Sequence, residues 1–185
     1  MNYPNNIKSR KNNINYSNRG MSLESDINIT NEYYKFNNIA HIYKKPTPIK
    51  VTKVVFDSKK NPIIKEAFYQ KPSTTDYNGI YKGKYIDFEA KETNSKTSFS
   101  LSNIHKHQIL HLFNIVAHGG IGFLIIKFTN KNETYLLKIE DLINLINNNN
   151  KSISYNFFIK YGYIIEEKYN PRLDYLKIID KIMEE

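Results

Sequence analysis

The stretch that decides the fold spans residues 73–91 and reads STTDYNGIYKGKYIDFEAK. Glu89 and Lys91 lie two residues apart, so on a strand both side chains point to the same face, roughly 7 Å apart. Two glycines earlier in the stretch allow a tight turn, and this turn brings Asp76 back beside Glu89. The stretch therefore predicts a β-hairpin that gathers two carboxylates and one ammonium group.

This cluster predicts a particular chemistry. Two carboxylates about 5 Å apart would repel each other by roughly 3 kcal/mol at an effective dielectric near 20, and a divalent cation between them removes this penalty. Oxygen ligands favour a hard cation, most simply Mg²⁺, with Mn²⁺ as a substitute. Such a metal polarises a phosphate and activates water, and a nearby lysine stabilises the developing negative charge. We therefore interpret Asp76 and Glu89 as metal ligands and Lys91 as a catalytic residue for phosphodiester hydrolysis.

Two alternatives remain open for this face of the strand. Glu89 and Lys91 could form an ordinary solvated pair, as charged residues two apart on a strand often do. Asp87 shares the face and could replace Asp76 as the partner of Glu89, or it could be a supporting or surface acid.

Length and composition set limits on the class of protein. A chain of 185 residues is long enough for one domain with a sizeable core. It has no cysteine, which excludes disulfides and thiolate metal sites and fits a cytoplasmic location. No segment approaches the ~18 apolar residues of a membrane span, and no signal peptide opens the chain, so we expect no membrane association. The net charge of +9 favours a polyanionic partner.

The positive charge is concentrated in two segments. Residues 1–19 contain four basic residues and no acid, and residues 44–71 contain eight lysines and two acids. The aperiodic, Asn-rich residues 1–18 predict a flexible basic arm that lies along phosphates, or simply a soluble terminus. Arg19, directly after this arm, is included among the predicted DNA contacts, and residues 19–185 form the predicted single domain.

The second basic segment predicts a hairpin inserted into the domain at about residues 46–70. Its two β-rich runs, 49–56 and 63–69, are joined by a polar turn. We interpret the hairpin as a projecting stalk whose lysines bind DNA; the alternative is an ordinary hairpin whose lysines protect an edge strand. Lysine grips phosphate but reads bases poorly, so recognition should follow shape and charge. The predicted contacts are Lys50, Lys53, Lys59, Lys60 and Lys65.

Periodicity elsewhere predicts an α/β core with three layers around a mixed sheet. The expected helices cover 19–36 with Ser22 as N-cap, 102–117 with Ser100 or Ser102 as cap and Gly119 at its end, 141–146, and an amphipathic segment after Pro171 that includes Leu173. The expected strands cover 39–43, 121–128 and 135–138, and the second of these is the buried central strand.

The helix over 102–117 contains the remaining candidate residues. Gln108 lies on its inward stripe, where it needs a partner: a metal, a metal-bound water or a backbone group. His107 and His111 have zinc-ligand spacing, but no third ligand converges with them, so we interpret them as polar-face residues. Either His105 or His107 could contact phosphate. Glu24, on the first helix, is interpreted as a first-turn acid outside the site.

Four segments carry a family resemblance. They are NRGMSLESDINITNEYY (18–34), KKPTPIKV (44–51), IKEAFYQKPSTTDYNGIYKGKYIDFEAKET (64–93) and PRLDYLKIIDK (171–181). Together they resemble the Holliday junction resolvase RecU family of low-GC Gram-positive bacteria, within the PD-(D/E)xK nuclease superfamily.

This resemblance implies a restriction-endonuclease-like core and a fuller set of site residues. It implies a metal held by Thr74, Asp76, Glu89 and Gln108, with Lys91 acting at the transition state. It further implies a stalk that enters the centre of a four-way DNA junction, and a homodimer that makes paired symmetric nicks during homologous recombination and DNA repair. A recombinase and a branch-migration helicase are candidate partners. Two other hypotheses remain: a sequence-specific duplex endonuclease of the same superfamily, and a non-catalytic junction-binding or strand-annealing protein.

Overall fold

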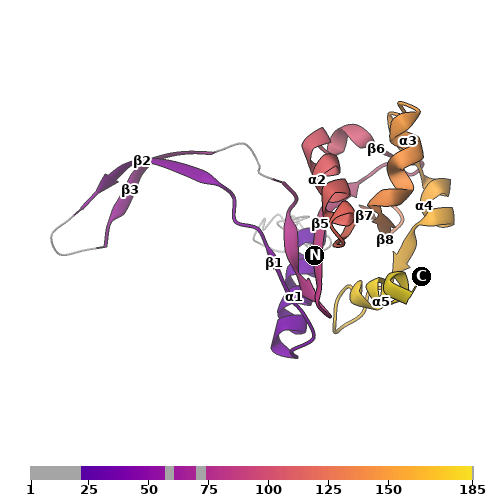
Figure 1. The fold of residues 1–185 in the computed structure, drawn as a ribbon, viewed down its shortest axis with the longest axis horizontal. Coiled ribbons are helices and arrows are strands. Elements are labelled where there is room, and N and C mark those ends of the chain that lie inside the picture. Colours follow the sequence, from indigo (N-terminus) through magenta and orange to yellow (C-terminus); the bar gives the residue numbers. More distant parts are fainter. Residues whose placement is uncertain (1–21, 57–60, 70–73, 185) are drawn as a thin grey trace, which may run out of the picture.

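The computed structural model describes residues 22–56, 61–69 and 74–184. They form a body and a hairpin that extends away from it (Figure 1). The body is built on a six-stranded sheet in the order β1-β4-β5-β7-β8-β10. These strands are β1 (His41–Lys44), β4 (Tyr77–Tyr81), β5 (Lys84–Thr93), β7 (Ile121–Phe128), β8 (Glu133–Lys138) and β10 (Tyr163–Ile165).

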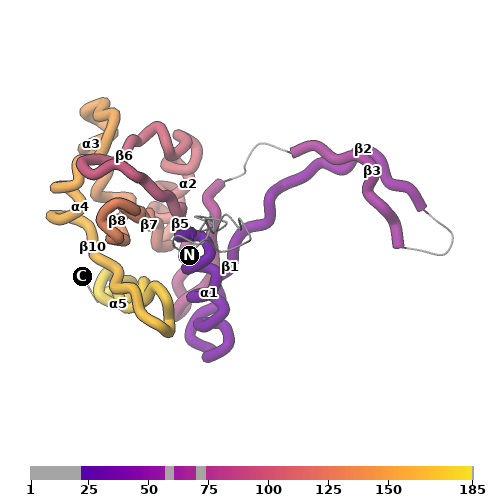
Figure 2. The backbone as a smooth tube through the Cα atoms, turned by 180° about the vertical axis from the view of Figure 1, so that it is seen from behind, coloured from indigo at the N-terminus to yellow at the C-terminus, as the bar shows by residue number. Residues whose placement is uncertain are grey.

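Helices cover both faces of this sheet. They are α1 (Leu23–Phe36), α2 (Lys106–Ala117), α3 (Ile143–Asn147), α4 (Tyr155–Tyr161) and α5 (Leu176–Glu184), with 3₁₀ turns at Leu101–Asn103 and Ile139–Leu142. Seen from behind, the tube trace places α3 and α4 on the side of the body opposite the hairpin (Figure 2). A short ribbon of β6 (Ser98–Ser100) and β9 (Ser152–Ser154) lies beside the main sheet. Within the described ranges, none of the helices combines the length and apolar character needed to cross a membrane.

The main sheet is mixed. β5 and β7 pair in parallel, while the other neighbouring strands pair antiparallel. The parallel pair needs a crossover, and α2 lies within that connection. β4 and β5 are joined by a tight turn in which Lys82 has φ 47° and Gly83 has φ 76°, the left-handed pair typical of a two-residue hairpin. The predicted α/β core with a mixed central sheet is confirmed.

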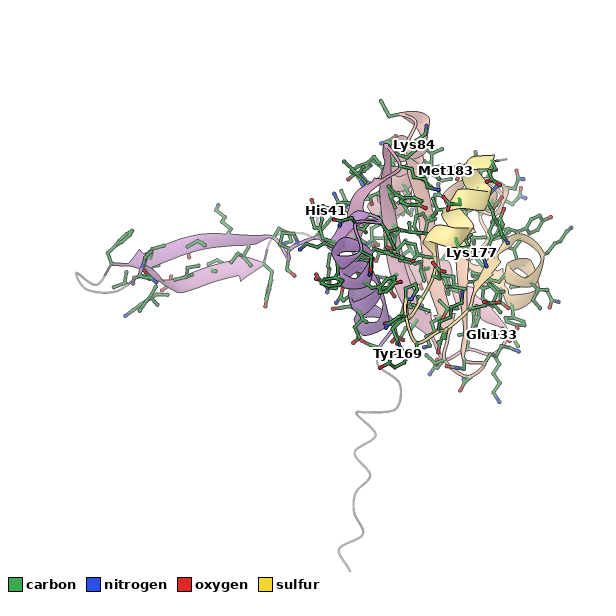
Figure 3. All side chains as sticks on the ribbon, turned by 90° about the horizontal axis from the view of Figure 1, so that it is seen from below. His41, Lys84, Glu133, Tyr169, Lys177 and Met183 are labelled. Atoms are coloured by element: carbon green, nitrogen blue, oxygen red, sulfur yellow. The ribbon has the colours of Figure 1, made fainter. Side chains whose placement is uncertain are left out.

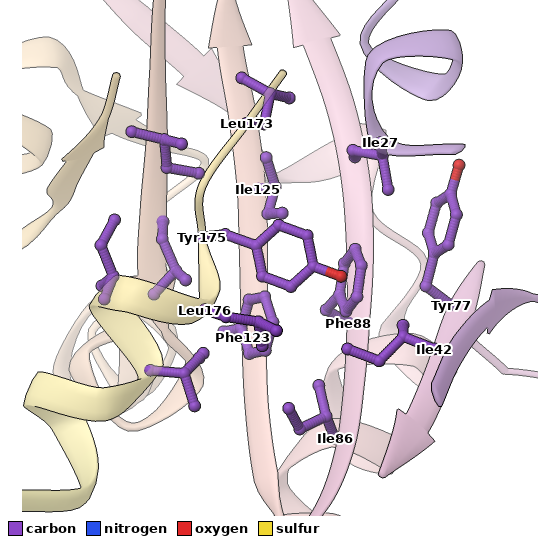
Figure 4. Packing of buried hydrophobic residues seen from close by; sticks show 14 of the residues in the cluster. Ile27, Ile42, Tyr77, Ile86, Phe88, Phe123, Ile125, Leu173, Tyr175 and Leu176 are labelled. Atoms are coloured by element: carbon purple, nitrogen blue, oxygen red, sulfur yellow. The ribbon is translucent and has the colours of Figure 1, made fainter. Parts of the chain in front are cut away.

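Successive side chains of the central strands point to opposite faces of the sheet, and this creates two hydrophobic cores. Ile86 and Phe88 point to the face covered by α1 and α5, whereas Leu124 and Ile126 point to the face covered by α2, α3 and α4. Phe88 stacks on Tyr77 and Phe123, with ring centroids 4.9 and 4.7 Å away, and the ring of Tyr175 covers the stack (Figure 4). The structure therefore has the three predicted layers.

The hairpin consists of β2 (Ile49–Val55) and β3 (Ile63–Tyr69), which pair only with each other among the described strands. Every residue of β3 is exposed, and so is every residue of β2 except the partly buried Val55. Figure 3 shows its side chains extending on both sides of the two-stranded ribbon. The prediction of a projecting stalk is confirmed for these strands. Residues 1–19, Lys59 and Lys60 lie outside the described ranges.

Two predicted helix starts are wrong. α2 begins at Lys106, because Ile104 is extended and turns its side chain into the core, separating α2 from the preceding 3₁₀ turn. Ser100 caps that 3₁₀ turn, and His105 is the N-cap of α2. At the other end, Leu173 pairs with Glu167 in an isolated β-bridge, so the terminal helix begins only at Leu176.

Candidate active site

The hairpin of β4 and β5 brings three predicted residues together. The backbone N–H of Asp76 donates to Glu89 Oε2 over 3.1 Å, which fixes the loop before β4 beside the middle of β5. Lys91 Nζ donates to Glu89 Oε1 and lies 3.7 Å from Asp76 Oδ2. The shared face follows from the two-residue period of β5, and the closeness of Asp76 follows from the register that pairs Tyr77 with Phe88.

The three side chains differ in their access to water. The carboxylate side chain of Glu89 is 0% exposed, whereas those of Lys91 and Asp76 are 30% and 40% exposed. Burial is the largest cause that raises the pKa of Glu89, to about 7 once the opposing hydrogen bond and charge of Lys91 and the added negative charge of Asp76 are included. A buried carboxylate of this kind is stabilised by any added cation.

This pKa predicts a pH-dependent stability of the metal-free protein. The folded state binds the Glu89 proton more tightly than the unfolded state, whose ordinary value is 4.5. The stabilising contribution of Glu89 is therefore complete below pH 4.5 and is lost as the pH rises through about 7, by up to about 3 kcal/mol. Denaturant unfolding in EDTA at pH 5 and pH 7.5 should show this loss in the wild type but not in Glu89→Gln. If stability depended on pH identically in the two proteins, the raised pKa of Glu89 would be wrong.

A cleft of about 240 Å³ opens beside the cluster. Asp76 and Lys91 line it together with Glu24 and Glu92. Glu24, which we placed outside the site from sequence, lies on this lining and forms an exposed ion pair with Lys44 at 2.6 Å. The cleft therefore exposes Asp76 and Lys91 on the side where α1 begins, whereas Glu89 lies behind them and does not line it.

Thr74 and Gln108 already have partners. Thr74 Oγ1 accepts from Lys45 Nζ over 2.9 Å. Gln108 is buried, and its Oε1 accepts from the backbone N–H of His105 over 2.9 Å, which is the backbone alternative considered for this residue. Each of these oxygens keeps a second lone pair, so a role as metal ligand stays a prediction.

The donor set can be compared with what a metal requires. Within the described ranges, no three His, Asp or Glu side chains converge as a metal site. A cation held by Asp76 and Glu89 would need further oxygens from Thr74, Gln108, the backbone or water. All of these are oxygen donors and one carboxylate is buried, so the residues fit a hard divalent cation.

Of the alternatives that the sequence left open for Asp87, the structure favours that of a supporting acid. It is completely buried, so it is not a surface acid. Its oxygens accept from Lys45 Nζ at 2.8 Å and Tyr85 OH at 3.1 Å, as well as from Thr75 Oγ1, and His111 Nε2 lies 3.0 Å away. The placement of His111 on a polar face is therefore wrong. The only sequence signal for this network was the position of Asp87 on the face of Glu89.

The predicted DNA contacts within the described residues are exposed. Lys50, Lys53 and Lys65 lie on the stalk strands, and Lys53 makes only a loose 3.9 Å ion pair with Glu66. His105 and His107, at the start of α2, stack on each other with ring centroids 5.4 Å apart.

Comparison with known proteins identifies the family. The model of the family described as "RecU: Recombination protein U" matches residues 18–181. This chain belongs to the RecU family. Relatives from Bacillus cereus (strain AH820), Bacillus anthracis (strain A0248) and Bacillus thuringiensis (strain Al Hakam) are each named Holliday junction resolvase RecU. Each is 51% identical over 171 residues, covering 90% of this chain and 86% of the relative.

The RecU resemblance inferred from the four quoted segments is thus confirmed. A solved structure of Archaeoglobus fulgidus Hjc, described as a Holliday junction resolvase from an archaeal hyperthermophile, also aligns with this RecU protein. That match has a TM-score of 0.43 and 13% identity, over 77% of this chain and 93% of the other.

Proposed function

We propose that this RecU protein is a metal-dependent endonuclease that resolves Holliday junctions by paired symmetric nicks in homologous recombination and DNA repair. Its close relatives are named Holliday junction resolvases. The observation that carries the mechanism is the approach of Asp76, Glu89 and Lys91 to one another, beside a cleft that Asp76 and Lys91 line.

The proposed roles follow from charge and burial. Asp76 and Glu89 hold Mg²⁺, for which Mn²⁺ could substitute, with Thr74 and Gln108 completing the ligand set directly or through water. When bound, the metal polarises the scissile phosphate and lowers the pKa of the attacking water. Lys91 Nζ donates to Glu89 Oε1 and lies 3.7 Å from Asp76 Oδ2, so its ammonium group would stabilise the negative charge that develops on a phosphate beside these carboxylates.

The stalk is the proposed junction-binding element. Lys50, Lys53 and Lys65 project on an exposed ribbon, where they can contact phosphates without disturbing the core. We extend the same role to Lys59, Lys60 and Arg19, and propose that residues 1–18 act as a basic arm ahead of a single domain formed by residues 19–185.

The remaining proposals concern assembly and location. A homodimer would present two active sites related by a two-fold axis, which suits two nicks on opposing strands of a junction. A cytoplasmic location and cooperation with a recombinase and a branch-migration helicase complete the proposal.

The function is tested by offering a mobile junction, a fixed junction and linear duplex DNA side by side, with Mg²⁺ or with EDTA. We expect paired nicks in the junctions with Mg²⁺, no cleavage in EDTA, and little cleavage of duplex. Equal cleavage of duplex and junction would favour a sequence-specific duplex endonuclease. Full activity in EDTA, or junction binding without nicking in Mg²⁺, would overturn the proposed metal-dependent reaction.

A further inference from the structure

The base of the stalk is closed by Lys45. Strand β1 ends one residue before it, and β4 begins one residue after Asp76. The backbone N–H of Lys45 donates to the carbonyl oxygen of Asp76 over 2.8 Å, which continues the pairing of β1 with β4 by one step. The outgoing and returning chains of the stalk therefore meet at the residue that is predicted to hold the metal.

The side chain of Lys45 strengthens this closure. Its ammonium group donates to Thr74 Oγ1 at 2.9 Å, Thr75 Oγ1 at 2.8 Å and Asp87 Oδ2 at 2.8 Å. An ammonium group has three N–H bonds, so these three acceptors use all of them. The side chain of Lys45 is only 16% exposed, and that of Asp87 is fully buried. The two residues that precede Asp76 are thus held by the ammonium group of Lys45, which also binds the buried carboxylate of Asp87.

The hydrogen bonds of Lys45 and Asp87 form a network that includes residues from each element that contributes a predicted catalytic or metal-binding residue. Asp87 lies two residues before Glu89 on the same face of β5. His111, the further partner of Asp87, lies on α2 three residues after Gln108. Leaving the buried carboxylate of Asp87 unpaired would cost several kcal/mol, so its partners are held in fixed positions around it.

We infer that Lys45 is a positioning residue for cleavage: together with Asp87 it fixes the loop that presents Asp76 to the metal, and it ties this loop to the base of the stalk. The inference rests on the proposed function of the site. A purely structural ion pair would contribute to folding but would not affect metal affinity in a folded variant. Lys45 differs from such a pair because its backbone and its ammonium group both bind the segment 74–76.

The test is Lys45→Met, which removes the ammonium group and keeps most of the side-chain length. Mn²⁺ binding is measured without DNA by water proton relaxation, and junction binding and single-turnover cleavage are measured separately. We expect Mn²⁺ affinity and the cleavage rate each to fall about 10–100-fold, the usual cost of losing a residue that supports metal ligands. Junction affinity should stay within about three-fold, because the phosphate contacts of the stalk remain.

Lys127→Met is the matched control. The side chain of Lys127 is only 8% exposed, and its ion-pair partners, Glu167 at 2.8 Å and Asp26 at 3.7 Å, do not belong to the loop 74–76. This variant should lose thermal stability but keep wild-type Mn²⁺ affinity.

A second variant covers the case in which Lys45→Met does not fold. Lys45→Met combined with Asp87→Asn removes both charges, so no buried carboxylate is left without its cation, and it should still bind Mn²⁺ weakly. Wild-type Mn²⁺ affinity and cleavage rate in either folded variant would overturn the inference. Failure of the proposed function looks different, because the wild type itself would then neither bind Mn²⁺ nor cut a junction.

Discussion

Glu89→Gln should slow junction cleavage by about 10²–10³-fold or more while junction affinity stays within about three-fold. The substitution keeps the shape of a fully buried side chain but removes the negative charge that would bind the cation. It also leaves Lys91 without its carboxylate partner at Oε1, so the lysine loses part of its orientation. Since the stalk strands are separate from this hairpin, DNA binding should persist.

The measurement is single-turnover nicking of a mobile junction at saturating Mg²⁺, with binding followed in Ca²⁺ or EDTA. Glu167→Gln is a suitable control, because Glu167 also accepts from one lysine ammonium group, that of Lys127, at 2.8 Å. The control should cleave at the wild-type rate. A Glu89→Gln protein that cleaves normally would remove Glu89 from the site, whereas loss of binding together with thermal stability would indicate misfolding.

The second large effect concerns the stalk. Replacing Lys50, Lys53 and Lys65 together by Ala should weaken junction binding by about 10–100-fold near physiological salt. Each phosphate contact contributes about 0.9 to the slope of log affinity against log salt, because binding releases counterions from the DNA. Loss of three contacts should therefore make this slope shallower by about 2.7. These side chains are exposed, so the thermal unfolding temperature should not change.

Binding titrations between 50 and 200 mM salt, at about four concentrations, measure both quantities. The control is the triple variant Lys160→Ala, Lys177→Ala and Lys181→Ala, which removes the same charge from exposed positions on α4 and α5. If both triple variants weaken binding equally, net charge rather than the stalk governs affinity, and the stalk assignment is wrong.

The elements that depend on local chemistry were predictable from the sequence. Glu89 and Lys91 share a face because a strand has a period of two, and Gly83 takes the positive φ that the tight turn requires. The buried run of β7 was recognisable from its apolar composition. The grouping of Asp76 with Glu89 then followed from the short turn between two adjacent strands.

The elements that depend on distant contacts were not predictable. Asp87 is contacted by Lys45 and His111, which lie 42 and 24 residues away in the sequence and reach it only in the folded sheet. The start of α2 was missed for the same reason, because burial of Ile104 overrides the capping signal of the serines before it.

The closed base of the stalk has a consequence for how RecU proteins can change. Because Lys45 is hydrogen-bonded to Thr74, Thr75 and Asp76, the chain between Lys45 and Thr74 is equivalent to one enlarged turn of the sheet. Doubling the length of such a connection costs only about 0.6 kcal/mol in closure entropy. Evolution can therefore lengthen, shorten or reshape this appendage to suit different branched substrates while the machinery beneath it stays intact.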